Sequence, residues 1–319
     1  MGCVREKIST LIQDIKGMGC NFPMLYINLD FIDKMEVEMC VNDVFFRSLK
    51  DIEKHVDKSL KNIEDYAALV EIKNKYSEAY IYSKLNSLLV LDKVPENEAR
   101  KTPDYKALFR GKNIYIELKS LNMLGGNSKH KEIMHDAFES KLYLEGEISK
   151  GNSVAFKEGE ICPYDKGNAD YDPRSVRLVI ELLIEKIGNN IKNEQYSCGD
   201  TVLLIDFSDQ LPIISKPSDA LQQHYYDGDS KSQVSGELWN VAFGRLNDAI
   251  YRASKFEGES NNDGLLEKQG VLISYPFIKG IVFHYWGHFY SIAQMTRDNS
   301  PVIHLLESLW DIFPEALLR

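Results

Sequence analysis

Three side chains between residues 103 and 119 are of the types that hydrolytic enzymes use. The segment reads as two short strands around a turn, with Asp104 near its start and Glu117 and Lys119 near its end. Because successive side chains of a strand point to opposite faces, Glu117 and Lys119 share one face and Ile116 belongs to the other. The second strand therefore has one apolar face and one face that carries a carboxylate beside an ammonium group.

Whether Asp104 joins this pair depends on the register of the hairpin. We expect Gly111-Lys112 to form a two-residue loop, which places Asp104 directly opposite Lys119 and Lys106 opposite Glu117. Asp104 is then a diagonal neighbour of Glu117 on the same face, within side-chain reach. A slip of one residue would turn Asp104 to the other face. The convergence of the three side chains is thus a prediction that depends on this register.

Two carboxylates beside a lysine suit the metal-assisted hydrolysis of a phosphodiester. Carboxylate oxygens are hard ligands for Mg²⁺ or Mn²⁺, and Mg²⁺ keeps several waters and also binds phosphate oxygens. Such a metal neutralises charge on the phosphodiester and lowers the pKa of a bound water. The lysine can orient or deprotonate that water, or stabilise charge that develops on phosphorus. We therefore interpret Asp104, Glu117 and Lys119 as catalytic residues, with Asp104 and Glu117 as metal ligands.

An alternative is that the acid–x–lysine pattern has no chemical role. In a chain of which 27% is charged, the pattern also arises by chance as a solvated strand face or a surface ion pair. Asp104 and Glu117 would then lie far apart in an unrelated α/β enzyme. The Pro103-Asp104 start, the alternating apolar strand and the intervening turn favour the catalytic interpretation.

Pro103-Asp104 and Glu117-Leu118-Lys119 resemble the two sequence elements of the PD-(D/E)xK nuclease superfamily, whose fold is that of the restriction endonucleases. The resemblance covers residues 63–210. It implies a core of a helix, three strands, a second helix and a fourth strand. It also implies Mg²⁺ as the cofactor, with Mn²⁺ as a substitute, and a glutamate on the first core helix that completes the metal site.

We predict the first core helix at 77–91, with Ser77 as its N-cap. Glu78 follows at the edge of the apolar face, where the resemblance makes it the third metal ligand. Two alternatives remain open. Glu78 can be an ordinary first-turn glutamate, which the helix dipole favours, and Glu71 lies one heptad earlier on the same face.

The remaining pattern predicts an α/β protein with a mixed, α+β type of sheet. A second core helix is expected at 175–191 and a buried strand at 201–207. We expect three regions: a mostly helical N-terminal region at 1–62, a restriction-endonuclease-like core at 63–210, and a C-terminal α/β extension at 211–319 that packs on the core.

Outside these elements, hydropathy and turn residues predict further helices, strands and loops. The expectations are a strand-like run at 24–29, helices near 129–149, at 237–256 and near 301–318, exposed loops at 157–173 and 224–236, and strands at 271–275, 280–286 and 288–292. His284 and His288 lie four residues apart, and on a hairpin we expect them to pack rather than to bind a metal.

The charge distribution favours a local contact with nucleic acid. The chain carries a net charge of −10, which excludes bulk coating of DNA. Nine Lys and Arg residues against four acids nevertheless give the segment 93–131 a local net of +5. We expect Lys101, Lys106 and Arg110 to contact phosphates there, and Arg177 to do so from the second core helix. A solubilising role for the basic strip, and a solvated position for Arg177, are the alternatives.

The five cysteines are scattered and odd in number, which favours free thiols in a reducing cytoplasm over a disulfide framework or a zinc site. No apolar run approaches the length of a membrane span, and the first residues lack the apolar stretch of a signal peptide. We therefore expect a cytoplasmic location and no membrane partner.

Taken together, these patterns predict an Mg²⁺-dependent endonuclease that hydrolyses DNA, with RNA the less favoured substrate. A homodimer or a partner protein is compatible with the large flanking regions, as is a role in restriction or anti-phage defence. The alternative function is a binding or assembly module that keeps a nuclease-like fold without turnover. Degenerate modules of that kind lose a metal ligand or the lysine, whereas this chain retains both elements.

Overall fold

The computed structural model describes most of the chain and divides it into two compact units. The first unit comprises Met1–Lys84 with Asn122–Asp165, and the second comprises Leu85–Leu121 with Lys166–Arg319. The predicted boundaries at 62 and 210 differ from this division. The described residues are 3–17, 24, 27–63, 65–95, 101–121, 127–157, 175–207, 222–227, 230–251, 262–285, 288–294 and 300–310.

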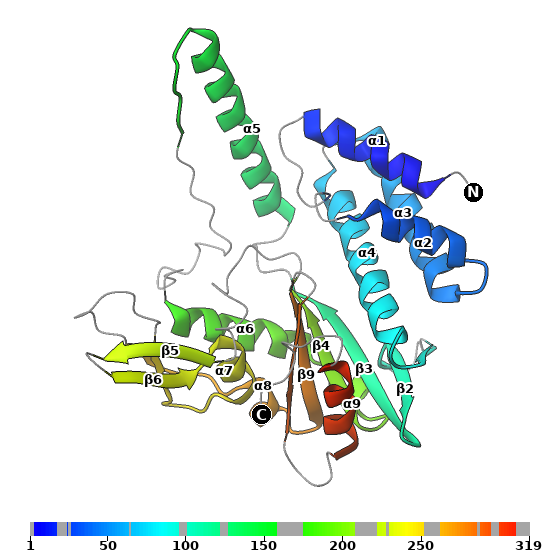
Figure 1. Ribbon diagram of the computed structural model, residues 1–319, viewed down its shortest axis with the longest axis vertical. Coiled ribbons are helices and arrows are strands. Elements are labelled where there is room, and N and C mark those ends of the chain that lie inside the picture. Colours follow the sequence, from blue (N-terminus) through cyan, green and yellow to red (C-terminus); the bar gives the residue numbers. More distant parts are fainter. Residues whose placement is uncertain are drawn as a thin grey trace. The chain divides into compact units, whose positions relative to one another are not determined.

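The first unit is helical, as Figure 1 shows for the blue and cyan segments. Asparagine caps begin two of its helices, because the Asn28 and Asn42 side chains accept hydrogen bonds from first-turn N–H groups. Its core includes aromatic pairs in which Phe31 meets Tyr76 and Phe45 meets Tyr82 edge to face. The helices are α1 (Val4–Gly17), α2 (Leu29–Glu38), α3 (Asp43–Lys61), α4 (Tyr66–Asn86) and α5 (Asn127–Ser149).

Two sequence predictions in this region need correction and one is confirmed. Ser77 does not cap a helix, because α4 already starts at Tyr66 and continues through it. The strand-like run at 24–29 forms no strand in its described residues, since Leu29 opens α2 and Asn28 caps it. The helix expected near 129–149 is present as α5.

The second unit is built on a mixed six-stranded sheet in the order β1-β2-β3-β4-β9-β10. The central strands β3, β4 and β9 are parallel, and the outer neighbours pair antiparallel. The strand β4 is buried at every position, as predicted for 201–207. The strands are β1 (Leu91–Lys93), β2 (Tyr105–Phe109), β3 (Lys112–Ser120), β4 (Thr201–Asp206), β9 (Ile278–Tyr285) and β10 (His288–Ala293).

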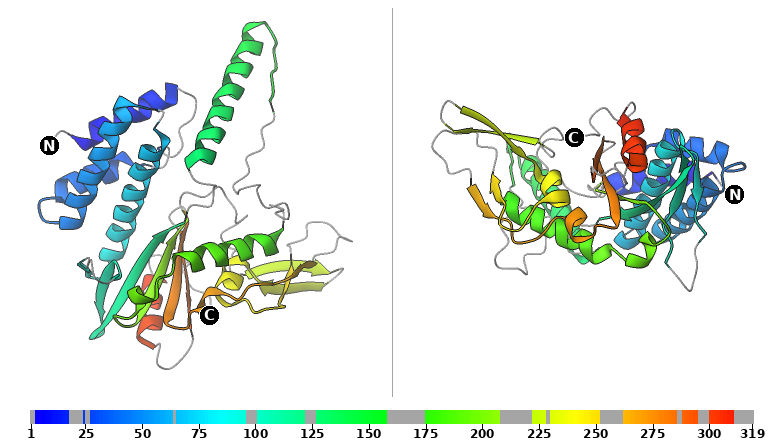
Figure 2. Two further views of the ribbon diagram at one scale, coloured as in Figure 1. Left: turned by 180° about the vertical axis from the view of Figure 1, so that it is seen from behind. Right: turned by 90° about the horizontal axis from the view of Figure 1, so that it is seen from below.

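Two helices lie on opposite sides of this sheet, as the two views of Figure 2 agree. One is α6 (Val176–Asn190), which confirms the helix predicted at 175–191, and the other is α9 (Ser300–Trp310). Helix α9 packs against β9 at Gly280. The Cβ atom of a larger residue at this position would lie 3.1 Å from the Leu306 side chain. Because Gly280 shares a face with Ile116 through the sheet register, Glu117 and Lys119 project from the face opposite α9.

Smaller elements complete the second unit and correct three further predictions. The helix expected at 237–256 ends at Gly244, where a Cβ would meet a backbone oxygen at 2.6 Å. The segment 224–236 contains a hairpin rather than a loop, and 271–275 opens with a short helix rather than a strand. These elements are β5 (Gln222–Asp227), β6 (Ser230–Ser235), α7 (Glu237–Phe243), β7 (Ala249–Tyr251), β8 (Asn262–Leu265) and α8 (Val271–Ser274).

The last predicted helix, near 301–318, is present as α9, and its residues beyond Trp310 lie outside the described part of the chain. The predicted loop at 157–173 also lies outside the described residues, except for its first position. Among the helices that the structure describes, none combines the length and the apolar character that crossing a membrane requires.

Candidate active site

The β2–β3 hairpin holds the candidate catalytic residues in a register that differs from the predicted one by two positions. Phe109 pairs with Lys112, so the loop is Arg110-Gly111 and not Gly111-Lys112. Both loop residues have a positive φ, +48° and +78°, as a type I′ turn requires. The sequence offered only one glycine for the two left-handed positions, and Arg110 adopts the other.

The observed register brings Asp104 closer to Glu117 than predicted. Tyr105 pairs with Ile116, and one more step of the same ladder sets Asp104 opposite Glu117 itself. Because the error was two residues, the face of each side chain is unchanged. The Asp104 Oδ2 atom accepts a hydrogen bond of 2.9 Å from the Leu118 backbone N–H, which holds this carboxylate against β3. Asp104 and Glu117 are therefore neighbours, contrary to the chance-pattern alternative.

Glu117 is buried, with 1% of its surface exposed, and its two carboxylate oxygens have different surroundings. The Oε1 atom forms an ion pair with the Lys119 ammonium and accepts a hydrogen bond of 2.5 Å from the Gln195 amide. The Oε2 atom has no hydrogen-bond partner among the described residues. Burial raises the pKa of Glu117 to about 7 and the charge of Asp104 adds to the rise, while Lys119 and Gln195 oppose it.

A short 3₁₀ helix, η2 (Asn193–Tyr196), contributes two side chains that sequence reasoning missed. Gln195 and Tyr196 are both buried, and the Tyr196 hydroxyl has no hydrogen-bond partner among the described residues. Burial raises the pKa of Tyr196 well above its usual range, and the charges of Glu117 and Asp104 add to the effect. The signal in the sequence is a Gln-Tyr pair separated by four residues from β4, the strand that runs parallel to β3.

The donor set of this site fits a divalent cation. The buried Oε2 of Glu117 has no partner within the part of the chain that the structure describes. A buried carboxylate oxygen without a partner carries a desolvation cost that a cation would offset. Among the described residues, no three His, Cys, Asp or Glu side chains gather into a metal-binding group. A pair of carboxylates nevertheless matches the coordination preference of Mg²⁺, which binds one or two carboxylates and keeps several waters.

Comparison with protein-family models, with curated proteins and with solved structures finds no match to this chain.

The two candidates for a third metal ligand lie in the first unit. Glu78 forms an ion pair of 2.9 Å with Lys75, one turn earlier on α4. Glu71 lies on the same helix and is partly exposed. The structure does not place either carboxylate relative to Asp104 and Glu117, which belong to the second unit. The role of Glu78 as a metal ligand therefore stays a prediction, with Glu71 as its alternative.

Three of the four predicted phosphate contacts lie on or near the hairpin, on the surface of the second unit. Lys101 is exposed, and its backbone N–H lies 3.4 Å from the Glu194 carboxylate. Lys106 forms an ion pair with Asp92 at 3.3 Å. In the observed register Lys106 is opposite Tyr115 and not Glu117. The guanidinium of Arg110 lies over the Phe109 ring at the turn.

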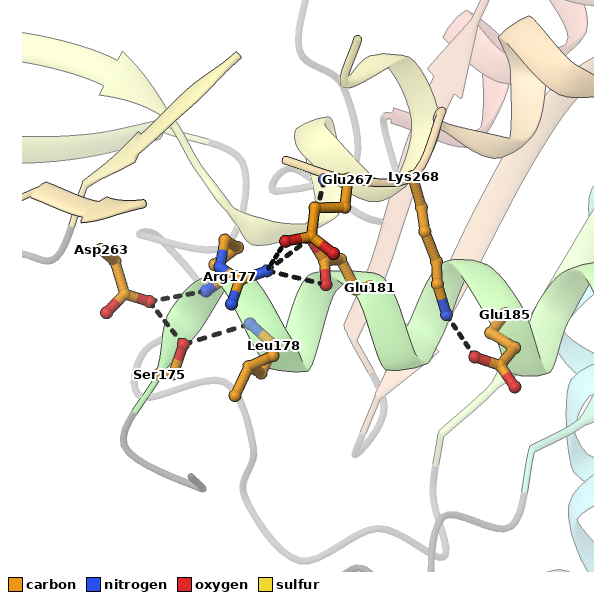
Figure 3. A network of polar contacts seen from close by, with 8 residues as sticks. All are labelled: Ser175, Arg177, Leu178, Glu181, Glu185, Asp263, Glu267 and Lys268. Atoms are coloured by element: carbon orange, nitrogen blue, oxygen red, sulfur yellow. Dashed lines mark hydrogen bonds and ion pairs between the residues drawn. The ribbon is translucent and has the colours of Figure 1, made fainter. Parts of the chain in front are cut away.

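Arg177 lies in the first turn of α6, and it belongs to a network that joins this helix to the segment around Glu267 (Figure 3). Its phosphate contact stays a prediction. Its guanidinium donates to both oxygens of Glu181 at 3.0 Å and lies 3.5 Å from Glu267. Its backbone N–H donates to Asp263, which also accepts from the N-cap Ser175. The side chain is only 20% exposed, so its contacts are structural rather than those of a solvated arginine.

A second buried acid–base pair lies on the other face of the sheet. His284 and Asp206 share a hydrogen bond of 2.9 Å, and each is at most 4% exposed. In the β9–β10 hairpin His284 pairs with Phe289 and His288 with Tyr285. The two histidine positions therefore lie in a β-hairpin, as predicted.

Proposed function

We propose that this protein is a divalent-metal-dependent nuclease that hydrolyses phosphodiester bonds of DNA. The observation that carries the proposal is the arrangement of Asp104, Glu117 and Lys119 on one side of the β2–β3 hairpin. Two adjacent carboxylates lie there beside a lysine that remains 23% exposed, and one of them has a buried oxygen with no partner in the described part of the chain. The site can thus hold a cation and still admit water and a phosphate group.

The chain order of the elements supports the same family of activities. The sequence runs α4, β1, β2, β3, α6, β4, apart from α5, which lies between β3 and α6. This agrees with the helix, three strands, helix and strand that the resemblance to the PD-(D/E)xK superfamily implies. We therefore propose a restriction-endonuclease-like core for this chain, and α5 as an insertion in it.

Each side chain would have a separate task. Asp104 and Glu117 would bind the cation, since the register sets the two residues opposite each other and Asp104 is hydrogen-bonded to β3. The Lys119 ammonium would orient the attacking water and stabilise the negative charge that develops on the phosphate oxygens. A bound Mg²⁺ supplies charge neutralisation and acidifies a coordinated water. Ile114 and Ile116, which are buried on the other face of β3, keep the hairpin in the sheet.

The test is cleavage of plasmid DNA, linear duplex DNA and single-stranded RNA by the purified protein, with Mg²⁺, with Mn²⁺ or with EDTA. The Lys119→Ala variant is compared with Lys268→Ala. Lys268 forms a partly exposed ion pair with Glu185 and is not one of the candidate site residues. We expect metal-dependent cutting of DNA by the wild type and by Lys268→Ala, and none by Lys119→Ala. Equal cutting by Lys119→Ala and the wild type would refute the mechanism.

A further inference from the structure

The candidate site contains three buried oxygen atoms that lack hydrogen-bond partners within the described residues. They are Oε2 of Glu117, Oε1 of Gln195 and the hydroxyl oxygen of Tyr196. Their residues are 1%, 7% and 5% exposed, so bulk water does not satisfy these atoms. Buried polar groups in proteins are nearly always paired, and an unpaired group indicates strain, function, or a water or ion that belongs there.

The three oxygen atoms without partners belong to a single site. The Gln195 amide nitrogen bonds to Glu117, which fixes the amide oxygen of the same group beside that carboxylate. Tyr196 is the next residue of η2, and the charges of both Glu117 and Asp104 act on its hydroxyl. Its ring packs on Phe277, 5.3 Å between centroids, so the hydroxyl has a fixed position.

We propose that Gln195 and Tyr196 belong to the metal site and supply its uncharged oxygen atoms, beside the carboxylates of Asp104 and Glu117. In this arrangement Gln195 is a positioning residue: its amide nitrogen holds Oε1 of Glu117 and leaves Oε2 for the cation. The Gln195 oxygen and the Tyr196 hydroxyl then bind waters of the hydrated cation, as Mg²⁺ and Mn²⁺ require in a site with only two carboxylates. The inference deepens the proposed function and rests on it for the identity of the ligand.

The sequence position of the pair explains how the fold makes such a site. Helix α6 ends at Asn190, and the η2 turn bridges it to β4, the parallel neighbour of the strand that carries Glu117. The connection between α6 and β4 therefore supplies Gln195 to the face from which Glu117 projects. The same element supplies the aromatic ring that covers this end of the site.

The experiment measures Mn²⁺ binding directly, from the electron paramagnetic resonance signal of free Mn²⁺ in titrations of the full chain without nucleic acid. Gln195→Leu keeps the side-chain volume and removes both polar atoms, and Tyr196→Phe removes only the hydroxyl. The matched controls are Asn193→Ala, an exposed residue of the same 3₁₀ helix, and Tyr275→Phe, whose ring also contacts Phe277. Glu117→Gln reports whether the binding belongs to this site.

We expect Gln195→Leu to weaken Mn²⁺ binding about tenfold or more, the scale seen when a residue that orients a metal ligand is removed. Tyr196→Phe should weaken it about two- to tenfold, as for one neutral hydrogen bond. Both controls should bind like the wild type, and Glu117→Gln should lose the binding. In EDTA, Tyr196→Phe should not lower the melting temperature, because it removes only a buried hydroxyl that has no partner among the described residues. Gln195→Leu should lower it slightly, since this change also removes the hydrogen bond from the Gln195 amide nitrogen to Glu117.

Two results would overturn the inference. One is unchanged Mn²⁺ affinity in both test variants, and the other is a lower melting temperature in EDTA with normal affinity, which indicates a structural role only. The absence of Mn²⁺ binding by the wild type would overturn the inference together with the proposed metal dependence. Mn²⁺ binding that Gln195→Leu weakens, without cleavage of any nucleic acid, would support this site and refute only the proposed activity.

Discussion

Two buried glutamates in the second unit, Glu117 and Glu181, are placed in opposite ways. Both are less than a tenth exposed, and each is paired with one basic side chain. Glu181 has both oxygens bound by Arg177, and one of them also accepts a hydrogen bond of 2.8 Å from the Glu267 backbone N–H. Glu117 has one oxygen with two partners and one with none among the described residues.

We infer from this difference that Glu181 has a structural role, and the difference supports the functional role proposed for Glu117. A buried charge whose hydrogen bonds are complete contributes to holding α6 and the Glu267 segment together. A buried carboxylate that keeps one oxygen without a partner costs stability, and a fold tolerates that cost where a ligand offsets it. The two glutamates are similar in burial and in having one basic partner. They differ in the hydrogen bonds that their individual carboxylate oxygens accept.

The largest expected effect concerns the charged residues of the candidate site. Asp104→Ala and Lys119→Ala should each lower the rate of DNA cleavage by about 10²-fold or more, the scale of lost acid–base or electrostatic catalysis. The fold should survive, because the Asp104 and Lys119 side chains are only partly buried and neither belongs to the buried apolar core. Cleavage rates at saturating DNA and thermal melts of the same samples check both points. A melt far below the wild type would assign the lost activity to misfolding.

The second effect is a pH dependence of stability that Glu117 introduces. Its folded-state pKa of about 7 exceeds its ordinary 4.5, so the folded protein holds this proton more tightly than the unfolded chain does. The stability linked to it is complete below pH 4.5 and is lost as the pH rises through 7. In EDTA, urea unfolding should show the wild type losing on the order of 1–3 kcal/mol between pH 5 and 8.

The Glu117→Gln variant sharpens this prediction, because its amide does not ionise. Relative to the wild type it should be less sensitive to pH over this range and more stable at pH 8 without metal, although it should not cleave DNA. Added Mg²⁺ should stabilise the wild type at pH 8 and leave the variant unchanged, since a ligand stabilises only the state that binds it. Equal pH profiles for the two proteins would contradict the assignment.

The third effect concerns Arg177, the partner of Glu181, where we expect a loss of stability without a loss of activity. Arg177→Met should cost about 2–4 kcal/mol of stability, because it leaves a buried carboxylate without its charged partner. The rate of cleavage per folded molecule should not change. In the double variant with Glu181→Leu, most of the lost stability should return, since no unpaired charge remains. A loss of DNA affinity without a loss of stability would instead support the predicted phosphate contact of Arg177.

The smallest effect is expected for the exposed end of the same network. Lys268 and Glu185 form an ion pair that remains 38% and 53% exposed. Lys268→Ala should change the free energy of unfolding by less than about 1 kcal/mol, because water and salt screen such pairs. Urea unfolding at low and high salt measures this directly. A cost as large as that of Arg177→Met would mean that exposure does not separate the two ion pairs.

Much of the architecture could be predicted from residue patterns. The apolar stripe of α6, the continuous apolar run of β4 and the alternation in β3 determine these elements locally, and all three were predicted. Helix starts and short elements were predicted less well. Ser77 lies inside α4 rather than at its start, and the segment 271–275 contains a helix where its apolar run indicated a strand. In both cases packing against neighbouring elements overrode a local signal.

The sequence by itself determined which residues could do chemistry, and it put Asp104, Glu117 and Lys119 on one face of a hairpin. That result holds because side-chain direction in a strand has a period of two, so an error of two residues in register leaves the faces unchanged. Tertiary structure alone decided the surroundings of these residues. Gln195 and Tyr196 come from a turn 78 residues or more beyond Glu117, and Arg177 is held by Glu181 and Glu267. Hydrogen bonds between distant segments have no local period, so no pattern along the chain could reveal which carboxylate oxygen would be left without a partner.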